Sequence, residues 1–305
     1  MSISLSHKNA WATTWTALVT PLQKDKSLDR ESLSLLLKRQ IASGIKNFVI
    51  AGSTGEGSLI SNETFQELLT ETQEITKNDH CAIVAGVTCS STDETLEKAK
   101  TAISCGVHGL LASPPPYIKA PDRSLLEFFM ALTELKTPIC LYEIPGRCAQ
   151  SISENLLIEI IRADREKNSM IHALKDASCN FERLARWSKK LSEEITFLSG
   201  DDASYPEFLG NGGQGIVSVA THFLAEHYQT LLLEKDSPGE AAKKHSQKIP
   251  FIDALFKDSN PIPCKSLAQE LSFIKETTFI HPLTHSLPED LQELKRLYKQ
   301  QGELS

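Results

Sequence analysis

A lysine at the end of a short apolar run is the residue of this sequence whose type and place suggest chemistry. Residues 170–174 read Met-Ile-His-Ala-Leu, and Lys175 and Asp176 follow at once. Four apolar residues in five are typical of a strand buried on both faces, as in a parallel sheet. Lysine is rarely buried without a partner, so Lys175 could point to solvent or pair with Asp176. Alternatively, it lies where a barrel strand delivers catalytic groups. Burial would then lower its pKa and leave a neutral amine able to form an imine with a carbonyl group.

Residues of suitable chemistry also follow the other apolar runs of the chain. They are Ser53 and Thr54 after residues 48–51, Tyr117 after 109–112, Tyr142 and Arg147 around the end of 139–142, Gly200 after 196–199, and Val217 within 215–219. Barrel enzymes place their chemistry on the loops that follow the strands, at one face of the barrel. If these runs are strands of one barrel, we expect the residues to meet around Lys175.

Each of these residue types has a purpose if a keto acid forms an imine with the lysine. The Ser53-Thr54 pair lies between glycines and exposes hydroxyls and backbone N–H groups to a carboxylate. The Tyr142 hydroxyl can take part in the proton transfers of imine formation. Arg147 offers a bidentate cation to a second carboxylate. Gly200 lets the backbone approach the substrate closely.

Several of these residues also have ordinary structural interpretations. Residues 52–56 could form a tight turn or a phosphate-binding turn, although the Gly-Lys-Ser/Thr ending of a nucleotide loop is missing. Tyr142 could be barrel packing, and Arg147 could form a surface ion pair. His281 and His285 have the spacing of metal ligands on a helix, but a proline lies between them, so we expect no metal site there.

The elements that must position these residues alternate regularly along the chain. The strand candidates are residues 15–20, 48–51, 82–87, 109–112, 139–142, 170–175, 196–199 and 215–219. The helix candidates are residues 27–42, 61–76, 93–104, 122–135, 153–163 and 180–191, with a short helix after residue 202 and with Ser61 and Thr92 as N-caps. This alternation predicts an α/β fold, a (β/α)8 TIM barrel with additional C-terminal helices. We expect the barrel over residues 1–225 and a helical region packed on it over residues 226–305.

Composition limits the function classes. The chain has 305 residues and a net charge of −7, and its Lys and Arg are scattered, which argues against nucleic-acid binding. Seven cysteines without a CxxC motif indicate reduced thiols in a cytoplasmic protein. The N-terminus lacks the apolar core of a signal peptide, and no apolar run approaches the length of a membrane span.

Seven segments together carry a resemblance to a known family. They are residues 17–21 (Ala-Leu-Val-Thr-Pro), 52–56 (Gly-Ser-Thr-Gly-Glu), 114–117 (Pro-Pro-Pro-Tyr), 141–147 (Leu-Tyr-Glu-Ile-Pro-Gly-Arg), 174–177 (Leu-Lys-Asp-Ala), 199–203 (Ser-Gly-Asp-Asp-Ala) and 212–218 (Gly-Gly-Gln-Gly-Ile-Val-Ser), with Asn-Pro-Ile-Pro-Cys-Lys at 260–265 closing the pattern. On these motifs the chain resembles the dihydrodipicolinate synthase (4-hydroxy-tetrahydrodipicolinate synthase) family. That family belongs to the class I pyruvate aldolases, which include N-acetylneuraminate lyase.

The resemblance implies a reaction and a role for each matching residue. Lys175 would form a Schiff base with pyruvate, and Tyr142 would donate protons in a relay with Ser53 and Tyr117, the latter reaching in from a neighbouring subunit. Further implied contacts are Thr54 and the backbone of Val217 for the pyruvate carboxylate, and Arg147 for the carboxylate of aspartate semialdehyde. The product would lead to diaminopimelate and lysine. The resemblance implies no cofactor, and it implies a homotetramer or homodimer.

The chain departs from the family pattern at several positions. The synthases usually have threonine at the position of Ser53. Serine at this position is the pattern of the neuraminate lyases, whereas Arg147 favours the synthase. Pro116 replaces a tyrosine of the tight-dimer interface. The positions that bind feedback lysine in sensitive members are here Gly57, Ser58, Asn62, Phe65, Ser90, Glu94 and Pro116, and only Glu94 keeps the sensitive type. We therefore expect weak or absent inhibition by lysine. The alternatives are another pyruvate aldolase, such as a neuraminate or keto-sugar-acid lyase, and a barrel that binds keto acids without turnover.

Overall fold

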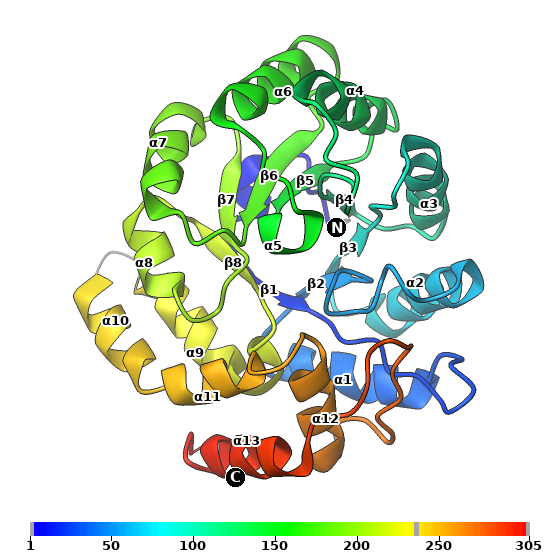
Figure 1. Cartoon of the computed structure of the whole chain (residues 1–305), viewed down its shortest axis with the longest axis vertical. Coiled ribbons are helices and arrows are strands. Elements are labelled where there is room, and N and C mark those ends of the chain that lie inside the picture. Colours follow the sequence, from blue (N-terminus) through cyan, green and yellow to red (C-terminus); the bar gives the residue numbers. More distant parts are fainter. Residues whose placement is uncertain (1–2, 235–237, 303–305) are drawn as a thin grey trace.

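Eight parallel strands form a closed barrel in the computed structural model, which describes residues 3–234 and 238–302 (Figure 1). The strands are β1 Thr14–Ala17, β2 Asn47–Ile50, β3 Ala82–Gly86, β4 Gly109–Ala112, β5 Ile139–Glu143, β6 Ile171–Asp176, β7 Thr196–Ser199 and β8 Gly215–Ser218. Each strand pairs with the next one along the chain, and β8 pairs with β1. The predicted (β/α)8 barrel is confirmed.

The strands form because their sequences are almost entirely buried. All six residues of β6 are buried, as are all residues of β1, β4, β5, β7 and β8. Side chains of successive strand residues point alternately into the barrel and towards the surrounding helices. Both faces of the sheet are thus covered, as a parallel sheet requires.

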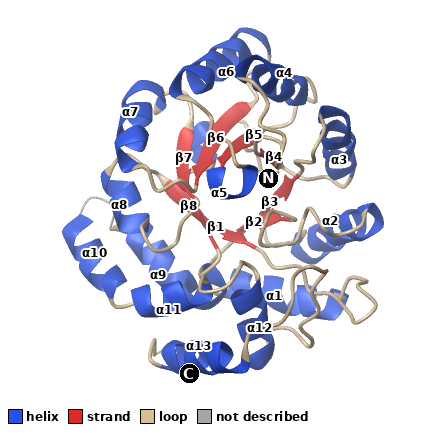
Figure 2. Ribbon diagram, viewed as in Figure 1, coloured by secondary structure: helices blue, strands red, loops and turns tan. Residues whose placement is uncertain are grey.

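Helices surround the barrel (Figure 2). They are α1 Arg30–Ala42, α2 Asn62–Thr76, α3 Thr92–Ser104, α4 Asp122–Thr133, α6 Glu154–Lys167, α7 Phe181–Leu191, α8 Tyr205–Gly210 and α9 Thr221–Leu233. The Ser61 side chain caps α2 by accepting a hydrogen bond from the Thr64 N–H, as predicted. The predicted cap of α3 is wrong by one residue. Ser91 rather than Thr92 is the N-cap, because its hydroxyl is the group that accepts from the Glu94 N–H.

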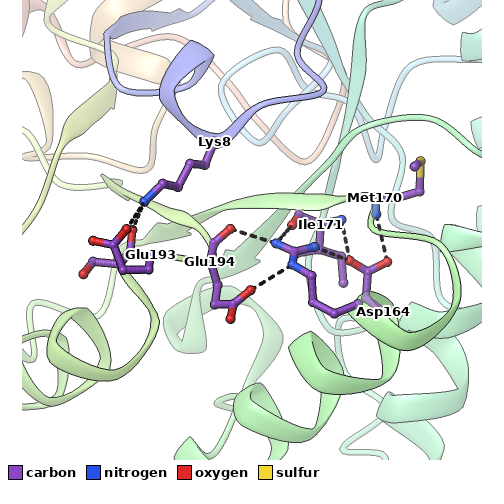
Figure 3. Close-up of polar contacts among 8 residues, drawn as sticks. Lys8, Asp164, Met170, Ile171, Glu193 and Glu194 are labelled. Atoms are coloured by element: carbon purple, nitrogen blue, oxygen red, sulfur yellow. Dashed lines mark hydrogen bonds and ion pairs between the residues drawn. The ribbon is translucent and has the colours of Figure 1, made fainter.

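The amino-terminal segment covers the end of the barrel at which the strands begin. A 3-10 helix, η1 Lys8–Ala10, is held by hydrogen bonds from the Thr196 hydroxyl to the Lys8 carbonyl (2.6 Å) and from the Trp11 indole to the Leu5 carbonyl (3.0 Å). Figure 3 shows Lys8 reaching Glu193 at the same end. The opposite end of the barrel, where the strands stop, is not covered by this segment.

The C-terminal helices pack outside the barrel, beside α1, α8 and α9 (Figure 1). They are α10 Pro238–Ser246, α11 Ile249–Leu255, α12 Ile262–Glu270 and α13 Pro288–Lys299. The connection between α11 and α12 carries Asn260 back to the carboxyl ends of the strands. Across residues 3–234 and 238–302, no helix combines the length and the apolar character needed to cross a membrane.

Candidate active site

Lys175 and Tyr142 lie side by side on neighbouring strands. Tyr142 of β5 is in register with Lys175 of β6, and the two side chains are 7% and 6% exposed, respectively. The Lys175 Nζ atom lies 4.2 Å from the centre of the Tyr142 ring. Lys175 therefore does not point to solvent, and Asp176 is bonded to Arg183 rather than to Lys175. An amine and a phenol are brought together at the end of the barrel where chemistry is expected.

Gly200 leaves room for the lysine. A Cβ atom at residue 200 would lie 3.0 Å from Lys175 Cε and 2.7 Å from Ala177 Cβ. Contacts that short require the neighbours to shift, so any larger residue would displace the lysine side chain. The sequence analysis expects Gly200 to let the backbone approach the substrate. In the structure, the group that approaches Gly200 is the Lys175 side chain.

Ser53 and Thr54 lie on the loop that joins β2 to α2. The Thr54 side chain is buried, and its hydroxyl accepts a hydrogen bond from Asn260 Nδ2 at 2.9 Å. The loop turns sharply enough that a Cβ at Gly57 would lie 1.7 Å from the Ala51 carbonyl oxygen, so only glycine fits there. The close turn directs the hydroxyl residues towards the end of the barrel.

Arg147 lies on a short helix that the sequence did not predict. This helix, α5 Pro145–Cys148, directly follows β5, and Figure 2 shows it within the ring of strands in this view. The Arg147 side chain is exposed, and its Nη2 donates to the Asn260 carbonyl oxygen at 2.9 Å. Asn260 thus contacts both Thr54 and Arg147. The sequence analysis includes Asn260 only in the family motif at residues 260–265 and gives it no role, because no local signal shows that the fold returns it to this cluster of residues.

These residues border a cavity of about 440 Å³ at the carboxyl ends of the strands, which we call the mouth cavity. Of the predicted site residues, Ser53, Tyr142 and Arg147 line it, together with Asn260. Lys175, Thr54 and Val217 are buried and are not among the residues that line the mouth cavity. Tyr117 does not join them within this chain, because its side chain is 91% exposed. The structure therefore brings Ser53, Tyr142 and Arg147 to one cavity, with Lys175 against the Tyr142 ring and Thr54 bonded to Asn260.

A buried ion pair supports the wall of the mouth cavity. Glu56 follows the Ser53-Thr54 pair, and its carboxylate lies 2.6 Å from the Lys265 ammonium of α12, both side chains being 0% exposed. The second carboxylate oxygen accepts from the Ile280 N–H at 3.0 Å. Burial lowers the pKa of Lys265 despite the neighbouring carboxylate. This pair fixes the loop between β2 and α2 to the C-terminal region.

Two thiols near the site are kept neutral by their surroundings. Burial raises the pKa of the Cys140 thiol, which lies beneath Lys175, to about 12. Burial likewise raises the pKa of the Cys148 thiol, which lines the mouth cavity and donates to the Ser113 hydroxyl. Because a thiolate, not a thiol, is the nucleophile, these cysteines are packing groups rather than candidate nucleophiles.

Comparison with known proteins decides the family. The sequence matches the Dihydrodipicolinate synthetase family over residues 11–301, which is almost the whole chain. The chain belongs to this family. Lys175, Tyr142 and Arg147 lie in the segments, residues 141–147 and 174–177, that carry the family resemblance.

Similar proteins within the family are known in sequence and in structure. The 4-hydroxy-tetrahydrodipicolinate synthase of Bdellovibrio bacteriovorus is 32% identical over 294 residues, which cover 95% of this chain and 98% of that protein. The dihydrodipicolinate synthase of Cyanidioschyzon merolae, solved with lysine bound, is 30% identical with a TM-score of 0.90, covering 96% of this chain and 98% of that one. A structure described as the first monomeric dihydrodipicolinate synthase variant is 26% identical with a TM-score of 0.87, covering 96% and 97%.

Proposed function

We propose that this chain is a 4-hydroxy-tetrahydrodipicolinate synthase that condenses pyruvate with L-aspartate 4-semialdehyde, a step towards diaminopimelate and lysine. The observation that carries the proposal is the buried amine of Lys175, with its Nζ 4.2 Å from the centre of the Tyr142 ring at the carboxyl end of the barrel. An amine held in such a place can attack the keto carbon of pyruvate and form an imine with loss of water.

In this proposal Tyr142 moves the protons of imine formation, in a relay with Ser53 and Tyr117. The imine loses a methyl proton to give an enamine, whose carbon attacks the aldehyde of the second substrate. Attack of the substrate's amino group on the imine carbon then closes the ring and releases Lys175. The position of Tyr142, in register with Lys175 and lining the mouth cavity, supports this assignment.

The two substrates would be held by different residues. We assign the pyruvate carboxylate to Thr54 and to the backbone of Val217, which are both buried, with Gly200 leaving space for the lysine. We assign the carboxylate of aspartate semialdehyde to Arg147. The Arg147 guanidinium is anchored on the Asn260 carbonyl, borders the mouth cavity and remains exposed to an incoming acid.

We further propose that the chain is a cytoplasmic enzyme that assembles into a homodimer or homotetramer. All seven cysteines are free thiols, as in a reducing compartment. Tyr117 and Ile118 are 91% and 51% exposed on the loop between β4 and α4, and an exposed aromatic of this kind is a candidate for insertion into a second copy. Sedimentation equilibrium tests the assembly, and a purely monomeric chain that is fully active would contradict it.

An assay with both substrates tests the function. Formation of the cyclic product from pyruvate and aspartate semialdehyde can be coupled to a reductase that consumes it. Turnover with aspartate semialdehyde supports the synthase. Turnover with N-acetylmannosamine and pyruvate, but not with aspartate semialdehyde, would instead identify a neuraminate lyase, which the serine at position 53 also permits.

A further inference from the structure

A buried carboxylate follows each of the two central residues of the site. Glu143 comes directly after Tyr142 on β5, Asp176 comes directly after Lys175 on β6, and the two carboxylate residues are in register with each other. Because successive strand residues point to opposite faces, Tyr142 and Lys175 face the barrel interior and the carboxylates face the helix layer. Glu143 is 0% exposed and Asp176 is 3% exposed.

Arg183 of α7 joins these two carboxylates. Its Nη1 lies 2.9 Å from Glu143 Oε1, and its Nη2 lies 3.4 Å from Asp176 Oδ1 and 2.6 Å from the Ser178 hydroxyl. The guanidinium carbon lies 4.4 Å from the centre of the Trp187 ring, and the arginine side chain is 12% exposed. A planar guanidinium held on these sides has little freedom to rotate. The ends of β5 and β6 are therefore tied through one rigid group.

The carboxylates are also anchored by the backbone. The Ile152 N–H donates to Glu143 Oε2 and the Ser178 N–H donates to Asp176 Oδ1, both at 2.8 Å. Buried charges are tolerated only when their remaining oxygens are bonded in this way. We call Glu143, Arg183 and Asp176 the strand bridge.

The ladder between the same two strands is irregular lower down. Ile139 pairs with Ile171, but the next pair joins Cys140 to Ala173, so that β6 has one additional residue, His172, at this point. A bulge re-aims the side chains that follow it and breaks the regular pairing. The alignment of Tyr142 with Lys175 therefore depends on what holds the strands above the bulge, and the strand bridge lies one residue beyond that pair.

We propose that the strand bridge positions Tyr142 and Lys175 for proton transfer, so that Arg183, Glu143 and Asp176 are positioning residues of the reaction. This inference rests on the proposed function, because it assumes that Lys175 forms the imine and that Tyr142 serves it with protons. The competing explanation is that Arg183 only anchors α7 on the barrel.

Arg165 provides a matched control at the other end of β6. It donates to Asp164 Oδ2 (2.8 Å), Glu194 Oε2 (3.0 Å) and the Ile171 carbonyl (2.9 Å), and its side chain is 26% exposed. Figure 3 shows Asp164, Ile171 and Glu194 gathered at this point, and Ile171 is the first residue of β6. Removing Arg165 breaks a comparable set of bonds without touching the strand ends that carry Tyr142 and Lys175.

The experiment compares Arg183→Met with Arg165→Met in the full chain, at a temperature at which circular dichroism shows both to be folded. It measures kcat, the KM for pyruvate, and the rate at which borohydride traps the imine. We expect Arg183→Met to lower kcat and the trapping rate by about 10 to 10²-fold, since misplacing reacting groups by about 1 Å has this effect. We expect Arg165→Met to stay within about twofold of the unmodified chain in both rates. Arg183→Lys should lie between, because the charge remains and the fork is lost.

Equal catalytic rates in the two methionine variants, whatever their stabilities, would overturn the positioning role while leaving the proposed function intact. If Arg183→Met does not fold, Glu143→Gln is measured instead, because glutamine keeps only one of the two hydrogen bonds of Glu143. A lower kcat in that variant supports the proposal, and an unchanged kcat overturns it. Absence of any trapped imine in the unmodified chain would overturn the proposed function, and the positioning role with it.

Discussion

Replacing Lys265 with methionine would leave the Glu56 carboxylate buried without its cation. The two groups are 2.6 Å apart and both side chains are 0% exposed, so the carboxylate has no contact with bulk solvent. Removing one partner of such a pair costs about 3–5 kcal/mol. A chain of this length has an unfolding entropy of roughly 0.6 kcal/mol/K near the midpoint, so we expect Tm to fall by about 5–8 °C.

Lys100 and Glu97 offer a control with nearly the same geometry at the surface. Their charged atoms are 2.7 Å apart, but the side chains are 56% and 73% exposed. Exposed pairs contribute about 0–1 kcal/mol, so Lys100→Met should lower Tm by no more than about 2 °C. Adding Glu56→Gln to Lys265→Met removes the orphaned charge while keeping an acceptor for the Ile280 N–H, so the double variant should recover more than half of the loss.

Scanning calorimetry of the unmodified chain and the three variants, at equal concentration and pH 7, measures the shifts in Tm. The reasoning would be refuted if Lys265→Met and Lys100→Met lowered Tm by the same amount. It would also be refuted if the double variant were less stable than Lys265→Met, because the loss would then come from packing rather than from an uncompensated charge.

Three further predictions concern two buried histidines, inhibition by lysine, and Tyr117. Burial lowers the pKa of His227 to about 3 and lowers that of His245, so below pH about 6.5 the unfolded chain binds protons that the folded chain excludes. The free energy of unfolding measured in urea should therefore fall as pH drops from about 6.5 towards 4, less steeply in His227→Leu; equal slopes would contradict this. Lysine should inhibit weakly or not at all, because the Lys98 ammonium already donates to the Gly57 carbonyl and lies 4.7 Å from the centre of the Phe65 ring; strong inhibition at sub-millimolar lysine would refute it. Tyr117→Phe should lower kcat by about 10²-fold without changing the sedimentation coefficient, and full activity would remove Tyr117 from the relay.

The barrel could be predicted because each strand carries its own signal. The runs at residues 109–112 and 196–199 match β4 and β7 at both ends. Elsewhere the observed ends of the elements differ by a few residues from the predicted ones, for example where an N-cap residue fixes the start of a helix. The first helix begins at Arg30 rather than at Ser27, since the Asp29 side chain accepts from the Ser32 N–H and fixes the start.

The site could be predicted as far as its residues follow strands directly. Lys175 and Tyr142 lie at strand ends. The alternation of strands and helices therefore predicts that they lie close together, and the structure pairs them on neighbouring strands. Asn260 and Lys265 could not be found in this way. They come from a C-terminal segment whose return to the mouth cavity depends on helix packing, and helix packing leaves no local pattern. The one-turn helix α5 was missed because Pro145 and Gly146 read as a plain turn.

Mass spectrometry after borohydride treatment in the presence of pyruvate tests the central claim most directly. The account predicts one stable adduct per chain, carried by the peptide that contains Lys175, and none in Lys175→Ala. An adduct on any other lysine, or no adduct in the unmodified chain at saturating pyruvate, would contradict it.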